Sequence, residues 1–199
     1  MAAAEESTTA AAILDAARRC LLAEGYAAMS LRKVATEAGV PLSQVSYHFG
    51  SKSGLVLALL DMENRRRLER QQSMYARDAP LWRQYEQACD FLEEDLESGY
   101  VRVLQEMTAA GWSTPAIAER VRAMKQGWYD LLVEVVTDAS ERLDGIGPFT
   151  AAELATLIGC AFYGAEEDLL LGFDRHRVPI RSALRRVAEL IRRAEEGPR

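Results

Sequence analysis

Hydrogen-bonding side chains are concentrated in residues 42–52, which read LSQVSYHFGSK. Val45 and Phe49 lie four positions apart and share one face of a short helix, so the other side chains point outward. Glutamine and serine can bond to base edges, leucine can contact a thymine methyl group, and tyrosine, histidine and lysine can donate to phosphate oxygens. The candidate DNA-binding residues are Leu42, Ser43, Gln44, Ser46, Tyr47, His48 and Lys52, together with Ser30 and Arg32 upstream.

The residues before this stretch predict a helix that would position it. An apolar face at i, i+3, i+4 and i+7 is formed by Leu31, Val34, Ala35 and Ala38. Ser30 is a suitable N-cap, Gly39 suits a left-handed helix end, and Pro41 favours the start of a second helix. Two short helices joined by a glycine turn are typical of a helix-turn-helix. The same spacing also occurs in a helix pair with ordinary polar surface.

Three segments of the first quarter of the chain resemble the DNA-binding domain of the TetR family of bacterial transcription regulators. They are ILDAARRCLLAEGY at residues 13–26, AGV at 38–40 and YHFGSK at 47–52. The resemblance implies an all-α protein with an N-terminal three-helix helix-turn-helix domain and a C-terminal helical domain for ligand binding and dimerisation. The chain departs from the family pattern at Ser46 and Tyr47, where the family often has tyrosine and then a polar or basic residue.

Composition indicates an ordinary globular protein and offers little for catalysis. Of the 199 residues, 49% are hydrophobic and 27% are charged. Three widely separated cysteines argue against a disulfide framework and are expected to be reduced and mostly buried, and only two histidines are present. The sequence has no metal-ligand spacing, phosphate loop or nucleophile elbow. We therefore expect no enzyme activity, no metal and no cofactor.

The net charge of −6 is unevenly distributed. Residues 1–80 hold 10 Lys/Arg and 9 Asp/Glu, whereas residues 81–199 hold 14 and 21. The nearly neutral first part predicts few phosphate contacts per subunit, so that high affinity would need two subunits. The first residues lack a basic group typical of a signal peptide, and the most apolar stretch is too short to cross a bilayer, so we expect a cytoplasmic protein with no membrane partner.

Periodicity predicts about nine helices. Residues 1–8 are expected to be a disordered tail, 9–52 the DNA-binding domain, 53–80 a connecting helix, and 81–199 the effector-binding and dimerisation domain. The first helix should end near Glu24, and the connecting helix should cover Lys52 to about Ala76. The later helices are expected at 81–96, 100–110, 115–143, 151–171 and 179–194.

Two groups of charged residues, one on the connecting helix and one at residues 166–168, each allow two interpretations. Arg65, Arg66, Arg67 and Arg70 could bind phosphate, but a solvated face paired with Glu63 and Glu69 is favoured. Glu166, Glu167 and Asp168 could attract a cationic ligand or pair with Arg175, Arg177 or Arg181 across a dimer.

The helix after Thr150 is apolar on nearly all sides between Leu154 and Ala165, which predicts that a second subunit covers it. Packing within one chain is the alternative. Dimerisation through the last two helices would agree with the family resemblance. The dimer candidates are Leu154, Ile158, Phe162, Leu184, Val187 and Ile191.

Large side chains of the second domain could line a small-molecule pocket, although aromatics at helical spacing are also common in cores. The pocket candidates are Trp82, Tyr85, Tyr100, Met107, Trp112, Trp128, Tyr129 and Tyr163. The expected function is a ligand-responsive repressor that binds a palindromic double-stranded DNA operator as a homodimer and is released by a small molecule. The alternative is a helical protein-interaction module that keeps the helix-turn-helix as a scaffold.

Overall fold

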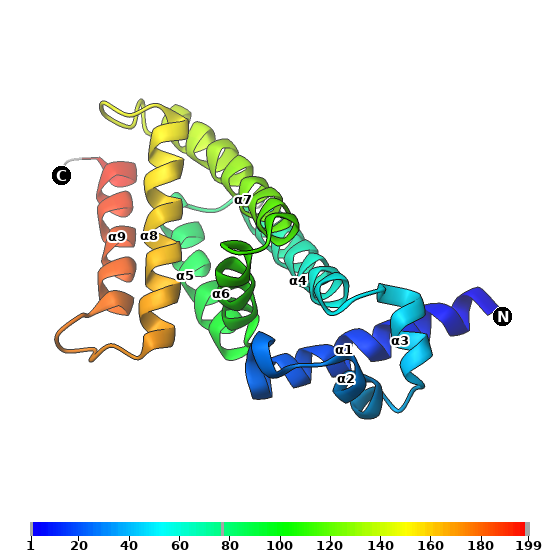
Figure 1. The fold of residues 1–199 in the computed structure, drawn as a ribbon. Coiled ribbons are helices and arrows are strands. Elements are labelled where there is room, and N and C mark those ends of the chain that lie inside the picture. Colours follow the sequence, from blue (N-terminus) through cyan, green and yellow to red (C-terminus); the bar gives the residue numbers. More distant parts are fainter. Residues whose placement is uncertain (1, 77, 198–199) are drawn as a thin grey trace. The chain divides into compact units, whose positions relative to one another are not determined.

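The computed structural model describes residues 2–76 and 78–197, and over these ranges the chain forms nine α-helices and no β-strand (Figure 1). The predicted all-α class is confirmed. The helices are α1 (Ala2–Ala28), α2 (Leu31–Ala38), α3 (Leu42–Phe49), α4 (Lys52–Tyr75), α5 (Leu81–Glu97), α6 (Tyr100–Gly111), α7 (Pro115–Arg142), α8 (Ala151–Leu171) and α9 (Ile180–Glu196).

Two compact units divide the chain at places that differ from the expected domain boundaries. The first unit comprises Met1–Arg66 and Arg102–Met124, and the second comprises Arg67–Val101 and Lys125–Arg199. Helix α6 and the start of α7 therefore join the first unit, where Glu106 accepts a hydrogen bond from Tyr26 N at 3.1 Å and Arg120 pairs with Asp61. Such long-range contacts leave no periodic signal in the sequence.

Helix α1 begins at Ala2, whereas a disordered tail was expected for residues 1–8. The alanine-rich composition of this segment favours helix, since alanine has the highest helix propensity. Within the span of α1, Gly25 is non-helical, with φ 77° and ψ 169°. The regular helix thus ends near Glu24, as predicted, because glycine adopts positive φ without a steric penalty.

The core of the first unit consists of apolar side chains at helical spacing. Buried members include Ile13, Ala16, Ala17, Leu21, Val34, Ala35, Val45, Leu55, Val56, Leu59 and Leu60. They come from α1 to α4, so the two short helices are held by the longer ones. This packing leaves the opposite face of α3 without a covering element from its own unit.

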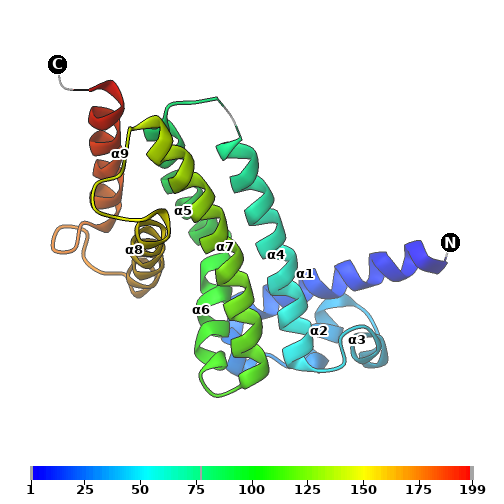
Figure 2. The same ribbon diagram turned by 90° about the horizontal axis from the view of Figure 1, so that it is seen from above.

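The second unit is built around α5, which lies beside α8 and α9 (Figure 2). Its core cluster contains Cys89, Leu92, Trp128, Leu132, Val136, Ala155 and Phe162. Gly159 is buried where α8 meets α7, and a Cβ at this position would lie 2.2 Å from Tyr129 Cε1. Only glycine permits this approach without movement of the ring. None of the helices in the described ranges is long and apolar enough to span a bilayer.

Candidate DNA-binding surface and ligand cavity

The turn between α2 and α3 has the geometry that the sequence predicts. The Ser30 hydroxyl accepts a hydrogen bond from Lys33 N at 3.3 Å and caps α2. Gly39 adopts the left-handed conformation with φ 68°, and its N–H donates to Thr36 O at 3.2 Å. Helix α3 begins directly after Pro41. The predicted helix-turn-helix is confirmed.

Helix α3 has one buried and one exposed face. Val45 is fully buried, and Phe49 is half-buried. The exposed positions are Leu42, Ser43, Gln44, Ser46 and Tyr47, as the sequence predicts. Tyr47 is 73% exposed, and its ring centroid lies 5.2 Å from that of the half-buried His48. The surface offers amide, hydroxyl and phenol groups to a large partner.

The remaining candidate contacts flank α3 and are more constrained. Lys52 Nζ donates to Ala27 O at 3.1 Å and lies 4.5 Å from the Tyr26 ring centroid. Phosphate binding by Lys52 would therefore replace contacts within the protein. Arg32 is exposed, and Ser30 can still donate its hydroxyl hydrogen while capping α2.

Much of the positive charge near this surface is already paired. Arg19 Nε lies 2.7 Å from Glu37 Oε1, and Lys33 Nζ lies 2.5 Å from Glu24 Oε2. These exposed pairs contribute little stability, but they reduce the local positive potential. The weak electrostatic attraction to phosphates expected from composition agrees with this arrangement.

Gly54 controls the exit from α3, a role that sequence reasoning missed. A Cβ at Gly54 would lie 2.3 Å from Phe49 O, the carbonyl at the end of α3. Any side chain there would force the end of α3 away from the first turn of α4. A glycine just inside a helix start was the available signal, because glycine is unfavourable in helices without such a reason.

The second unit contains a cavity of about 400 Å³. Its walls come from α4, α5, α7, α8 and α9 and are mostly apolar. The lining residues are Arg67, Gln71, Tyr75, Leu81, Gln84, Tyr85, Ala88, Leu92, Trp128, Leu132, Val135, Val136, Ala139, Leu143, Ile146, Leu154, Leu157, Ile158, Ala161, Phe162, Leu184, Val187 and Ile191.

Two of the eight pocket candidates, Tyr85 and Trp128, line this cavity. Met107 is fully buried in the first unit, and Trp112 is 85% exposed at the end of α6, so neither belongs to the cavity. The other four are also absent from the cavity lining. Trp82 stacks with Arg83, and Tyr100 lies beside Arg67. Tyr129 and Tyr163 pack near Trp128. Helical spacing alone does not show which face of a helix meets a cavity.

The six dimer candidates all line the same cavity, which the sequence did not indicate. They are Leu154, Ile158, Phe162, Leu184, Val187 and Ile191. Exposed apolar side chains on α8 and α9 include Leu157, Leu171, Val187 and Leu190, with exposed fractions of 53%, 69%, 36% and 63%, and two of them, Leu157 and Val187, also line the cavity. Cys160 on α8 is also exposed, although the cysteines were expected to be mostly buried.

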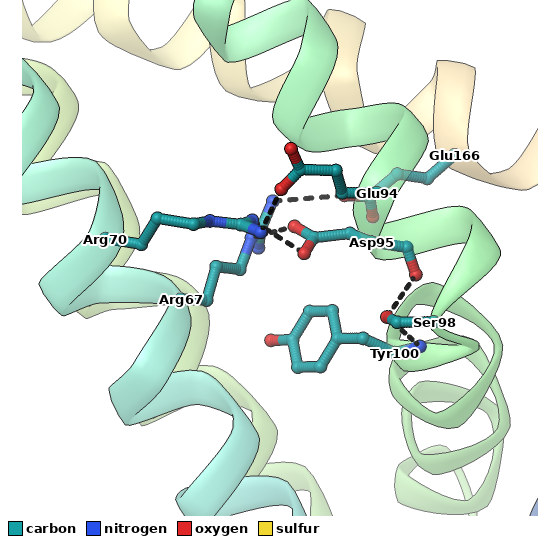
Figure 3. Close-up of polar contacts among 7 residues, drawn as sticks. All are labelled: Arg67, Arg70, Glu94, Asp95, Ser98, Tyr100 and Glu166. Carbon is teal, nitrogen blue, oxygen red and sulfur yellow. Dashed lines mark hydrogen bonds and ion pairs between the residues drawn. The ribbon is translucent and has the colours of Figure 1, made fainter.

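A buried ionic cluster lies beside the cavity (Figure 3). Arg67 is 6% exposed, with Nε 3.0 Å from Asp95 Oδ2 and Nη2 3.3 Å from Glu166 Oε1. Arg70 adds contacts to Glu94 at 2.9 Å and Asp95 at 2.6 Å. Neither sequence interpretation holds for Arg67, which is not on a phosphate-binding or solvated face. Glu166 is fully buried and pairs with Arg67, not with a loop arginine.

Burial determines the protonation of this cluster. Desolvation raises the pKa of Glu166 to about 7, with a further contribution from Asp95, while Arg67 and Lys125 oppose the shift. Desolvation likewise raises the pKa of Tyr100, which lies beside Arg67, to about 12. The sequence held no local signal for this burial, because the partners of Arg67, Asp95 and Glu166, lie far from it along the chain.

Among the described residues, no cluster of three or more His, Cys, Asp or Glu that could hold a metal ion occurs.

Comparisons with known proteins agree with this geometry. Residues 13–59 match the family model described as bacterial regulatory proteins, tetR family. No curated protein sequence matches the chain. Many solved structures share the fold.

Three similar structures cover almost the whole chain. A TetR transcription regulator from Haloarcula marismortui is 19% identical with a TM-score of 0.77, covering 93% of this chain and 96% of that one. The regulator FadR from Bacillus subtilis in complex with stearoyl-CoA is 14% identical with a TM-score of 0.75, covering 90% and 96%. A regulator from Saccharomonospora viridis in complex with choline is 20% identical with a TM-score of 0.73, covering 92% and 94%.

The helical fold and the exposed face of α3 define a helix-turn-helix transcription regulator. More specifically, residues 13–59 match the model of the TetR family of bacterial regulatory proteins, and the rest of the chain shares the fold of solved structures described as regulators of that family.

Proposed function

We propose that the protein acts in the cytoplasm as a repressor that binds a palindromic operator as a homodimer and releases it when a small molecule fills the cavity. The observation that carries this proposal is the outward face of α3. Ser43, Gln44 and Tyr47 are exposed, while Val45 anchors the helix in the core. A recognition helix needs this combination of a fixed backbone and accessible side chains.

DNA contacts follow from the chemistry of that face. Gln44 can donate to and accept from an adenine edge, and Ser43 can bond to either base type. Tyr47 and Ser30 donate to phosphate oxygens and set the position of the helix. Because the first unit is only weakly basic, two subunits must bind together, with recognition helices about 34 Å apart on one DNA face.

A dimer would cover the exposed apolar face of α8 and α9. Leu157, Leu171, Val187 and Leu190 expose large apolar side chains on these two helices. Such a surface favours association, and a two-fold axis would place the same residues on both sides. Of the residues predicted from sequence, Val187 belongs to both the cavity lining and this face.

The cavity supplies a place for an effector. Its volume of about 400 Å³ lies in the usual range for small-molecule sites, and two proteins of the same fold were solved with stearoyl-CoA and choline. Arg67, Gln71 and Tyr75 bring α4 into its wall, and the same helix begins at Lys52 next to the recognition helix. A ligand that favours one position of α4 would alter DNA affinity by about 1–3 kcal/mol, or roughly 5- to 150-fold.

Fluorescence anisotropy with operator DNA tests the proposal. A palindrome is first selected from a random duplex library, and binding is then measured at several salt concentrations. We expect cooperative binding of two subunits, with affinity falling as salt rises. Failure to enrich any palindrome, together with retention of a protein partner in a pulldown, would favour the protein-interaction module instead.

A further inference from the structure

The polar groups of the cavity are confined to the part lined by α4 and α5. Arg67, Gln71 and Tyr75 lie at i, i+4 and i+8 on α4, and Gln84 and Tyr85 lie opposite on α5. The walls from α7, α8 and α9 present only apolar and aromatic side chains among the lining residues. A ligand that fits must therefore be apolar over most of its surface and polar at one end.

Charge in this wall is already balanced. Arg67 is the one formally charged side chain among the described lining residues, and it pairs with Asp95 and Glu166. An anionic ligand would add a negative charge beside these two carboxylates, and a cationic ligand would meet the Arg67 guanidinium. Either ion would also lose its hydration in an apolar cavity, which is costly.

Gln71 gives the cavity an unused hydrogen-bond acceptor. Its side chain is 5% exposed, and Oε1 has no hydrogen-bond partner within the described part of the chain. Buried polar atoms in proteins are nearly always satisfied, so such an atom in a cavity wall indicates a missing donor. Gln71 also lies one turn from Arg67, directly beside the neutralised cluster.

We propose that the cavity binds an uncharged, largely apolar molecule whose hydroxyl or amide N–H donates a hydrogen bond to Gln71 Oε1. This inference rests on the proposed function, because it names the chemical class of the effector for the same site. The proposal predicts that neutral alcohols and amides bind more tightly than fatty carboxylates or amines of equal chain length.

Three probes with the same alkyl chain test the inference: decan-1-ol, decanoate and decylammonium. Binding to the full-length protein is measured by isothermal titration calorimetry. We expect decan-1-ol to bind most tightly. The Gln71→Leu variant should bind decan-1-ol about two- to tenfold more weakly, which corresponds to one hydrogen bond. Gln72→Leu, an exposed neighbour on the same helix that does not line the cavity, should bind as the parent does.

Three outcomes would overturn the inference: decanoate or decylammonium binding as tightly as decan-1-ol, binding of none of the probes, or Gln71→Leu retaining full affinity for decan-1-ol. Thermal unfolding checks that Gln71→Leu folds, and it should, because leucine removes a buried unpaired oxygen. The DNA assay separates the two proposals. If decan-1-ol binds as expected but operator affinity does not change, the ligand class stands and the regulatory proposal fails.

Discussion

Two groups of polar side chains, one on α3 and one around α4, are treated by the fold in opposite ways. On α3, Ser43, Gln44 and Tyr47 are exposed. On α4, Arg67 is buried between Asp95 and Glu166. The first group presents its side chains at the surface, and the second forms ion pairs within the protein.

The contrast shows how a charge or hydrogen-bonding group acquires its role. Exposed polar groups keep their contact with water in the folded protein, so α3 can present them for DNA contacts at almost no cost to folding. A buried arginine must be paired, because removing one partner leaves an uncompensated charge away from water. Substitutions on α3 should therefore affect binding alone, and substitutions in the α4 cluster should affect stability first.

The largest effect is expected for Arg67→Ala, which would leave Asp95 and Glu166 buried without their cation. We predict a loss of about 3–5 kcal/mol in the free energy of unfolding, typical of a broken buried ion pair. Urea denaturation followed by tryptophan fluorescence measures it. Arg66→Ala is the matched control, because Arg66 is exposed on the adjacent position and should change stability by less than about 0.5 kcal/mol. Equal effects of the two substitutions would contradict the buried pairing.

Gly54→Ala should disturb the recognition helix without altering any candidate contact. The new Cβ would overlap Phe49 O at 2.3 Å, and relief of this overlap must move the end of α3. Overpacking of this kind costs about 1–3 kcal/mol, and we expect operator affinity to fall by about tenfold or more. Gly127→Ala is the control, since its Cβ would meet only Leu68 at an ordinary 3.7 Å and should leave DNA binding unchanged. Normal operator binding by Gly54→Ala would show that α3 has room to adjust.

Gln44→Ala tests whether an exposed side chain of α3 contributes to DNA binding without contributing to stability. Loss of a base contact should weaken operator binding by about 1–3 kcal/mol, whereas the unfolding free energy should stay within about 0.5 kcal/mol because Gln44 is exposed. Anisotropy titrations and denaturation curves on the same preparation give both numbers. Arg122→Ala removes an exposed positive charge of the first unit outside the helix-turn-helix and serves as the electrostatic control. If both variants lose affinity equally, Gln44 does not read a base.

Sequence periodicity predicted the helices well, because each depends on local signals. Ser30, Gly39 and Thr150 mark helix ends through short-range chemistry, and all three act there in the structure. The exposed face of α3 followed from the positions of Val45 and Phe49 for the same reason. Local amphipathicity is sufficient when a helix has one covered side.

The cavity and the buried cluster could not be predicted in this way. Arg65, Arg66 and Arg67 are adjacent and chemically identical, yet only Arg67 of the three is buried, because the contacts that decide this come from Asp95 and Glu166, far away in sequence. Likewise, Leu154 and Ile158 line the cavity, a role that their spacing in the sequence did not indicate. An apolar residue has the same periodicity whether it meets a core, a cavity or a second chain.

The pH dependence of stability tests the protonation of the cluster. The pKa of Glu166 is raised to about 7 from 4.5 by burial, so the folded state holds this proton over a range in which the unfolded state has released it. The stability that Glu166 adds to the folded state is therefore fully present below pH 4.5 and decreases as pH rises towards 7. Arg67, Asp95 and Lys125 act on the same carboxyl, and Arg67 and Lys125 reduce the effect. Denaturation curves between about pH 5 and pH 7.5 should show a decline that is absent in Glu166→Gln. A decline of equal size in the variant would assign the pH dependence to other groups.

The smallest effects are expected for the two N-cap residues, Ser30 in the first unit and Thr150 in the second. Both accept a backbone hydrogen bond through a hydroxyl group, so the same substitution can be compared in the two units. Ser30→Ala removes the acceptor for Lys33 N, and Thr150→Ala removes the acceptor for Glu153 N, each bond measuring 3.3 Å. Either change should cost about 1 kcal/mol of stability, as N-cap replacements usually do. Only Ser30→Ala should also weaken operator binding, since Ser30 adjoins the recognition surface and Thr150 caps α8 in the second unit. Equal losses of operator affinity in the two variants would show that any small loss of stability lowers DNA binding. The distinction between a binding surface and a stabilising core would then no longer hold.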